Sequence, residues 1–199
     1  MQITPATHYK AYVYYLPQWK NEKNDAVKSL ASYYRIDKDE IGTASVSNSD
    51  VLRDSWYMMG KAVGGKDISA VVIDTHAGPD DLYFGDIDHD GYDDKNEYMY
   101  TDQIAKLGNK NIDNLILLGC NAGHLDYKYT NVAAAFSKKV NGGCVLASDG
   151  TVFAQYPLLL SWGTYSYTSV NDETFYGNCL GPRAHEGNWI PDNEGWIKY

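Results

Sequence analysis

Apolar runs alternate with segments of helical spacing through most of the chain. Runs rich in aliphatic and β-branched residues predict strands, and segments whose apolar positions recur at helical spacing predict helices. The predicted strands are residues 11–16, 41–46, 68–75, 114–118 and 144–148. The predicted helices are residues 24–36, a segment from Asn48 or Ser49 to Gly64 and Gly65, a segment from Thr101 or Asp102 to about Gly108, and residues 130–140.

This alternation predicts an α/β fold in which helices cover both faces of a mostly parallel sheet. The runs 68–75 and 114–118 are almost entirely apolar, which is typical of central parallel strands. Residues 82–84 predict a hairpin arm, and the tail from Thr151 predicts hairpins and irregular structure. We expect one domain over residues 1–199, with its core at about 10–150 and hairpins and loops over 151–199.

A histidine and a cysteine follow the two most apolar strands. His76 closes one run and Cys120 comes just after the other. The carboxyl ends of parallel strands meet at one edge of a sheet, and neighbouring strands lie about 5 Å apart. Singly, such a cysteine is typical of a small core residue and such a histidine of a turn. Together they favour a thiolate nucleophile beside its general base.

The backbone around this pair suggests an oxyanion site. The N–H of Cys120 is expected to face a developing oxyanion, with the N–H of Ala77 or Gly78 as a second donor. Glycines one residue before and three after the cysteine do not match the nucleophile elbow of α/β-hydrolases. A zinc site with His124 is not favoured, because no further ligand is suitably spaced.

The two segments that carry the pair resemble a known clan of enzymes. VVIDTHAG at 71–78 and LILLGCNAG at 115–123 resemble the paired His-Gly and Cys signatures of caspase-like cysteine peptidases. That clan includes caspases, clostripain, gingipains, separase and CHAT proteins. The resemblance spans about residues 68–150 and singles out no subfamily. It implies a three-layer αβα caspase-like fold and peptide-bond hydrolysis by a Cys120–His76 dyad.

The chain departs from this clan at two positions. Ala77 separates His76 from Gly78, where the clan has glycine directly after the histidine. Leu118 stands two residues before the cysteine, where clostripain-like members carry an acidic residue that receives arginine or lysine. The resemblance therefore gives no support for basic specificity by that route. Asp149 is an alternative pocket residue, although an aspartate before glycine is more typical of a turn.

An acidic loop predicts a calcium site. Residues 86–97, DIDHDGYDDKNE, match the twelve-position pattern D-x-D-x-D-G-x5-E. Asp93 replaces the apolar residue usual at the eighth position and no flanking helices are evident, so we expect a single loop. The alternative is a solvated acidic turn, but so many carboxylates repel one another without a cation. The expected ligands are Asp86, Asp88, Asp90, the Tyr92 carbonyl, Asp94 and Glu97.

Composition narrows the classes of partner. The formal charge of -9 argues against nucleic acid, and no stretch approaches the about 20 apolar residues that cross a bilayer. Three widely spaced cysteines, Cys120, Cys144 and Cys179, form neither a disulfide framework nor a paired metal motif.

The start of the chain bears on location. No signal peptide pattern is visible, and Met1 is compatible with a fragment of a longer parent chain. A single weak calcium loop fills at extracellular calcium levels, so we expect a secreted or surface-bound protein.

The sequence thus favours a calcium-supported cysteine endopeptidase or self-processing domain acting on a peptide or protein substrate. The alternative is a non-catalytic calcium-binding interaction module on the same fold.

Overall fold

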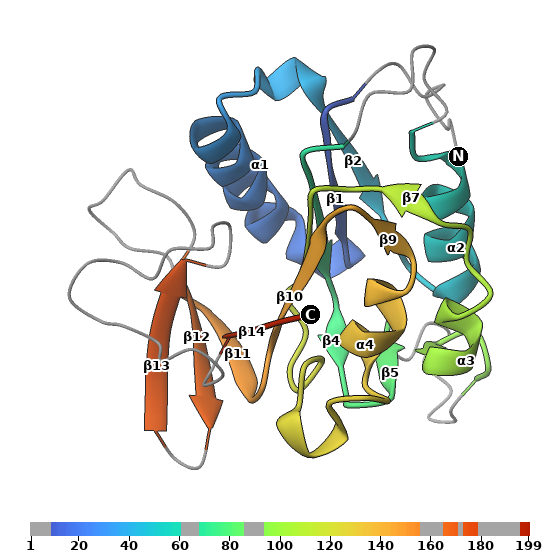
Figure 1. Cartoon of the computed structure of the whole chain (residues 1–199). Coiled ribbons are helices and arrows are strands. Elements are labelled where there is room, and N and C mark those ends of the chain that lie inside the picture. The colour runs from blue at the N-terminus through green and yellow to red at the C-terminus, as the bar shows by residue number, and fades with distance from the viewer. Residues whose placement is uncertain (1–8, 61–67, 86–93, 156–164, 171–172, 179–195) are drawn as a thin grey trace.

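The centre of the molecule is a six-stranded sheet. The computed structural model describes residues 9–60, 68–85, 94–155, 165–170, 173–178 and 196–199. The strand order is β14-β10-β8-β3-β1-β2 (Figure 1), and every neighbouring pair is parallel except β10 with β14. The chain is therefore a mixed α/β protein with a mostly parallel sheet, as predicted. The strands are β1 (Ala11–Tyr15), β2 (Ile41–Ser45), β3 (Ala70–Asp74), β8 (Asn114–Leu117), β10 (Cys144–Ser148) and β14 (Trp196–Lys198).

Helices pack on both faces of this sheet (Figure 1). Alternate residues of a strand point to opposite faces, so Val71 and Ile73 join the core under α2, α3 and α4, whereas Ala70 and Val72 join the core under α1. The α-helices are α1 (Lys20–Tyr34), α2 (Ser49–Met58), α3 (Thr101–Ile104) and α4 (Val132–Ser137). The 3₁₀ helices are η1 (Pro17–Trp19), η2 (Lys38–Glu40) and η3 (Leu125–Tyr127).

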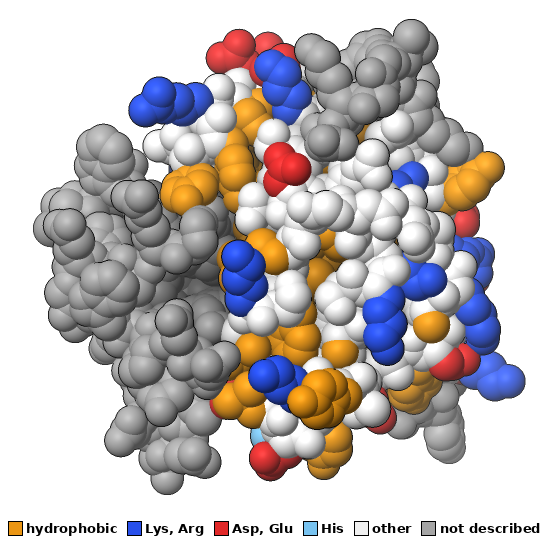
Figure 2. All heavy atoms as spheres, in the orientation of Figure 1, with side chains coloured by type: hydrophobic (Ala, Val, Ile, Leu, Met, Phe, Trp, Pro, Cys, Tyr) orange, Lys and Arg blue, Asp and Glu red, His pale blue; other side chains and the backbone are white. Residues whose placement is uncertain are grey.

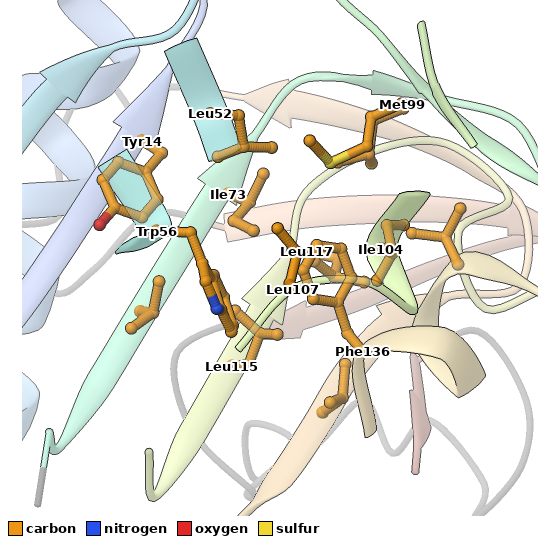
Figure 3. Close-up of a cluster of buried hydrophobic side chains, with 14 of the residues drawn as sticks. Tyr14, Leu52, Trp56, Ile73, Met99, Ile104, Leu107, Leu115, Leu117 and Phe136 are labelled. Carbon is orange, nitrogen blue, oxygen red and sulfur yellow. The ribbon is translucent and has the colours of Figure 1, made fainter. Parts of the chain in front are cut away.

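The larger core is centred on two aromatic rings. Trp56 and Phe136 lie with their centroids 5.4 Å apart above the central strands (Figure 3). The indole N–H of Trp56 donates to the carbonyl of Gly108 at 2.8 Å, so its polar atom is satisfied although the side chain is buried. This core supports β3 and β8, the strands that precede His76 and Cys120.

Several helix ends differ from the prediction. α1 begins earlier than expected and ends where Arg35 adopts a left-handed φ of 54°. α2 ends at Met58, and Gly60 at φ 70° turns the chain away; the predicted stop at Gly64 and Gly65 lies outside the described residues. Local backbone reversals thus end both helices. α3 is a single turn and α4 is shorter than predicted.

Smaller sheets surround the centre. The predicted arm is part of an antiparallel sheet of β4 (His76–Ala77), β5 (Asp81–Tyr83) and β6 (Tyr98–Tyr100). β7 (Lys110–Asn111) pairs with β9 (Val140–Asn141). In the tail, β11 (Thr151–Gln155), β12 (Tyr165–Val170) and β13 (Glu173–Asn178) form an antiparallel sheet.

The surface shows no single basic stripe on the face drawn in Figure 2, where the lysine and arginine side chains of the described residues are scattered. Among the described helices, none combines the length and apolar character that a membrane span requires.

Candidate functional site

Strand register brings His76 and Cys120 to the same edge of the sheet. Ile73 of β3 is paired with Leu117 of β8, and the N–H of Leu118 donates to the Ile73 carbonyl at 2.9 Å. His76 and Cys120 each stand three residues beyond this registered pair. The two residues therefore leave adjacent parallel strands at the same level.

Close backbone packing joins the two segments beyond the strands. A Cβ atom on Gly119 would collide with the Cβ of Ala77 and would lie 3.0 Å from the carbonyl oxygen of Thr75. The residue before Cys120 thus touches the residues on both sides of His76. Only a glycine permits this approach, which keeps the thiol segment beside the imidazole segment.

The turn that carries Cys120 is tied to the end of β10. The N–H of Asn121 donates to the Gly150 carbonyl and the N–H of Gly123 donates to the Ser148 carbonyl, both at 2.8 Å. Asn121 has a left-handed φ of 55°, a conformation that asparagine tolerates better than most residues. This fixed turn presents a half-buried Cys120 at the sheet edge.

A second brace comes from the end of β14. The hydroxyl of Tyr199 donates to the Gly123 carbonyl at 2.9 Å and accepts from the side-chain amide of Asn131 at 2.6 Å. Asn131 is fully buried, caps α4 through the N–H of Ala134, and donates to the His124 carbonyl at 3.1 Å. The thiol turn is therefore linked to both a helix and the edge strand.

Aromatic rings surround His76. The ring of Trp19 meets it edge-on at a centroid distance of 4.7 Å, and the ring of Tyr83 lies 6.0 Å away. Burial against these groups lowers the pKa of His76 below its usual 6.5, because burial penalises the charged imidazolium. The imidazole is therefore neutral at pH 7 and able to accept a proton.

The predicted oxyanion donors differ in their present bonding. The N–H of Gly78 donates to the Asp81 carbonyl at 3.1 Å, so it serves an oxyanion only if that turn opens. Ala77 belongs to β4 and is registered with Leu82. Cys120 lies in the turn described above, directly after the close contact made by Gly119.

The two candidate pocket residues occupy different environments. Asp149 is 7% exposed, and its Oδ1 accepts the N–H of Leu125 at 2.6 Å. The imidazole of His124 lies 3.8 Å from the same oxygen and itself accepts the N–H of Asp126. These bonds favour the turn-forming reading of Asp149 over a pocket role. Leu118 packs against the core under α1.

Two polar residues that the sequence analysis did not single out precede His76. Asp74 is 8% exposed, and burial together with the nearby charge of Glu22 raises its pKa to about 7. Thr75 is buried, and its hydroxyl has no partner among the described residues. Unpaired buried polar groups are uncommon and concentrate at functional sites. The sequence feature that could have identified this site is Asp74 itself, a single aspartate at the end of an otherwise apolar run.

The acidic loop is described only at its end. Asp86, Asp88, Asp90 and Tyr92 lie outside the described residues, so their geometry is not part of the structure. The Glu97 side chain is 1% exposed, and its Oε2 accepts the N–H of Asp94 at 3.1 Å. The backbone there is anchored, because the N–H of Phe84 donates to the Glu97 carbonyl and that of Ser49 to the Asn96 carbonyl.

Comparison with known proteins adds no assignment: no family model matches the chain, and no curated protein matches its sequence. The class that the fold defines is a mixed α/β protein with a histidine and a cysteine at the carboxyl edge of a mostly parallel sheet.

Proposed function

We propose that the chain is a cysteine peptidase domain of the caspase-like type, with Cys120 as nucleophile and His76 as general base. The observation that carries this proposal is the register: both residues stand three positions beyond the paired residues Ile73 and Leu117. A neutral imidazole on the segment next to a half-buried thiol suits nucleophilic cysteine catalysis.

The proposed reaction begins when His76 takes the proton of the Cys120 thiol. The sulfur attacks the scissile carbonyl carbon, the carbon–nitrogen bond breaks, and the imidazolium returns its proton to the leaving amine. Water then attacks the thioester and gives a proton to His76. The carbon–sulfur bond breaks, the carboxylic acid product leaves, and the sulfur regains the proton.

Calcium is proposed as a structural ion of the same domain. Burying a carboxylate as deeply as that of Glu97 is costly, and a cation bound by the acidic loop would offset part of that cost. Two of the proposed ligands, Asp94 and Glu97, lie among the described residues. Asp86, Asp88, Asp90 and Tyr92 would complete the set. The described end of the loop is bonded to the end of β5 through the N–H of Phe84 and the Glu97 carbonyl, so the ion would order the segment that follows His76. Filling at millimolar calcium would suit a secreted or surface-bound protein.

A non-catalytic calcium-binding interaction module is the second candidate. One observation favours it: the N–H groups of Gly78 and Asn121, both close to the dyad, already bond to backbone carbonyls. Peptide hydrolysis would then need Cys120 or Ala77 to provide the oxyanion donors. In the interaction module, Cys120 would be a packing residue of the turn.

Labelling by an electrophilic peptide probe distinguishes the two functions. We expect a peptide acyloxymethyl ketone to alkylate Cys120, located by mass spectrometry, and to lose that label in Cys120→Ala and in His76→Ala. Cys144→Ala and His124→Ala are matched controls that keep it. Burial raises the pKa of Cys144, whose thiol donates to Asn114 at 3.5 Å, and His124 is bonded within its own turn. An unlabelled Cys120 in folded, calcium-loaded protein would overturn the peptidase proposal.

A further inference from the structure

We propose that Asp74 determines the specificity of this site by binding a lysine or arginine side chain on the acyl side of the scissile bond. The inference rests on the proposed function, because it requires a peptide that acylates Cys120. Its support is the position of Asp74, its missing partner and the sign of the charges around it.

Asp74 lies at the right depth below the dyad. It is the last residue of β3 and stands two residues before His76, a stretch of chain that spans at most about 7 Å. The four-carbon stem of lysine, or the longer arginine, covers about this length. A basic side chain extending from a carbonyl held at Cys120 back along the sheet would therefore bring its charge to the level of Asp74.

The neighbouring strands place Asp74 in the middle of a row. Tyr15 of β1 is registered with Asp74, and Leu118 follows the residue paired with Ile73 on the other side. An aromatic ring and an aliphatic side chain therefore flank the carboxylate. Such neighbours suit the apolar stem of a long basic side chain, while the carboxylate suits its charged end.

Asp74 and His76 are reached from the same side of the sheet. Asp74 continues the alternation of Ala70 and Val72, which face α1. Glu22 of α1 acts electrostatically on Asp74, and Trp19, three residues before Glu22, contacts the ring of His76. Trp19 directly precedes α1 and Glu22 lies in its first turn, so the amino-terminal end of α1 lies near both Asp74 and His76.

The Asp74 carboxylate lacks a partner inside the described part of the molecule. No donor there bonds to it and no ion pair includes it, although the residue is more than nine-tenths buried. Lys23 lies instead over the ring of Tyr15, 5.7 Å from its centroid. Removing one partner from a buried charge is costly, so an arriving cation gains strongly from this carboxylate. Glu22 adds a second negative charge and favours a cation over an anion.

The test compares probes that differ only beside the reactive group. Peptide acyloxymethyl ketones ending in lysine, arginine or norleucine are reacted with the full chain in calcium, and the rate of Cys120 alkylation is measured. Norleucine keeps the length of the lysine stem without its charge. We expect lysine and arginine probes to react at least about tenfold faster than the norleucine probe, the size expected for a charge-assisted hydrogen bond. We expect Asp74→Asn to reduce that ratio to about one.

Asp54→Asn is the matched control, because it removes a carboxylate that is 71% exposed on α2 and should keep the preference. Equal rates for the lysine and norleucine probes in the wild type would overturn the role of Asp74 while leaving the peptidase proposal intact. An unchanged preference in Asp74→Asn would do the same. Failure of every peptide probe to label Cys120, with iodoacetamide still reacting, would overturn both.

Discussion

The buried carboxylate of Asp74 makes a quantitative prediction about stability and pH. Its pKa is about 7 in the folded protein against 3.8 for an ordinary aspartate, a difference of about 3. Each pKa unit corresponds to about 1.4 kcal/mol, so the charged carboxylate lowers the free energy of unfolding by about 4 kcal/mol. Between pH 4 and 7 the folded state keeps a proton that the unfolded state has released. Wild-type stability should therefore fall as the pH rises through this window.

Asp74→Asn isolates this effect, because asparagine has nearly the same shape and cannot ionise. We expect the free energy of unfolding of the variant, relative to that of the wild type, to increase by about 4 kcal/mol as the pH rises from 4 to 7 and to stay constant above that range. The measurement is urea unfolding followed by tryptophan fluorescence at a series of pH values and fixed calcium.

Asp54→Asn is the matched control, because the Asp54 side chain is 71% exposed. Its difference from the wild type should stay within about 0.5 kcal/mol across the series. A difference between Asp74→Asn and the wild type that is flat with pH would refute the reasoning. It would mean that Asp74 is charged at low cost, and the argument for an unsatisfied carboxylate would fail with it.

Three further outcomes are expected. Gly119→Ala should lower the free energy of unfolding by about 1–3 kcal/mol and abolish probe labelling, because the added methyl group separates the two segments of the site; Gly108→Ala, where nothing lies within 4 Å, is the control. Trp19→Ala should raise the pKa of His76 toward 6.5, because it removes burial, and the NMR titration of that ring and the acid limb of the activity profile should move up together. Glu97→Gln should weaken calcium binding in calorimetry and remove most of the stabilisation that calcium gives the wild type, about 1.4 kcal/mol at tenfold excess over the dissociation constant.

The last two expectations have their own controls. Tyr129→Ala removes a ring that is 83% exposed and should leave the pKa of His76 unchanged. Asp102→Asn removes an exposed carboxylate paired with Lys106 and should leave calcium binding intact. A wild-type chain whose melting temperature ignores both calcium and chelator would contradict the calcium proposal.

The sheet was predictable because its strands carry unambiguous patterns. The apolar runs that became β3 and β8 are buried on both faces, and their parallel pairing follows from the alternation with helices. The placement of His76 and Cys120 beyond those strands followed directly. Helix ends were less predictable. Arg35 ends α1 in a left-handed conformation, which glycine usually adopts and which an arginine in the sequence does not indicate.

The electrostatics of the site could not be predicted from the chain alone. The pKa of Asp74 depends on its depth and on Glu22, which belongs to a helix distant in sequence. The bond from Gly78 to Asp81 depends on how tightly β4 and β5 turn. The hydrogen bond from the N–H of Leu125 to the Asp149 carboxylate depends on how two loops pack together. Such effects belong to tertiary neighbours, which local patterns do not specify.

The link from Tyr199 to Gly123 has a consequence for how the protein is made. The two residues are separated by 76 positions, so the ring that braces the thiol turn is synthesised long after Cys120 has left the ribosome. A nascent chain that has completed β3 and β8 would still hold this turn without its brace. Full rigidity of the nucleophile segment should therefore be acquired late, after the edge strand β14 has docked against β10.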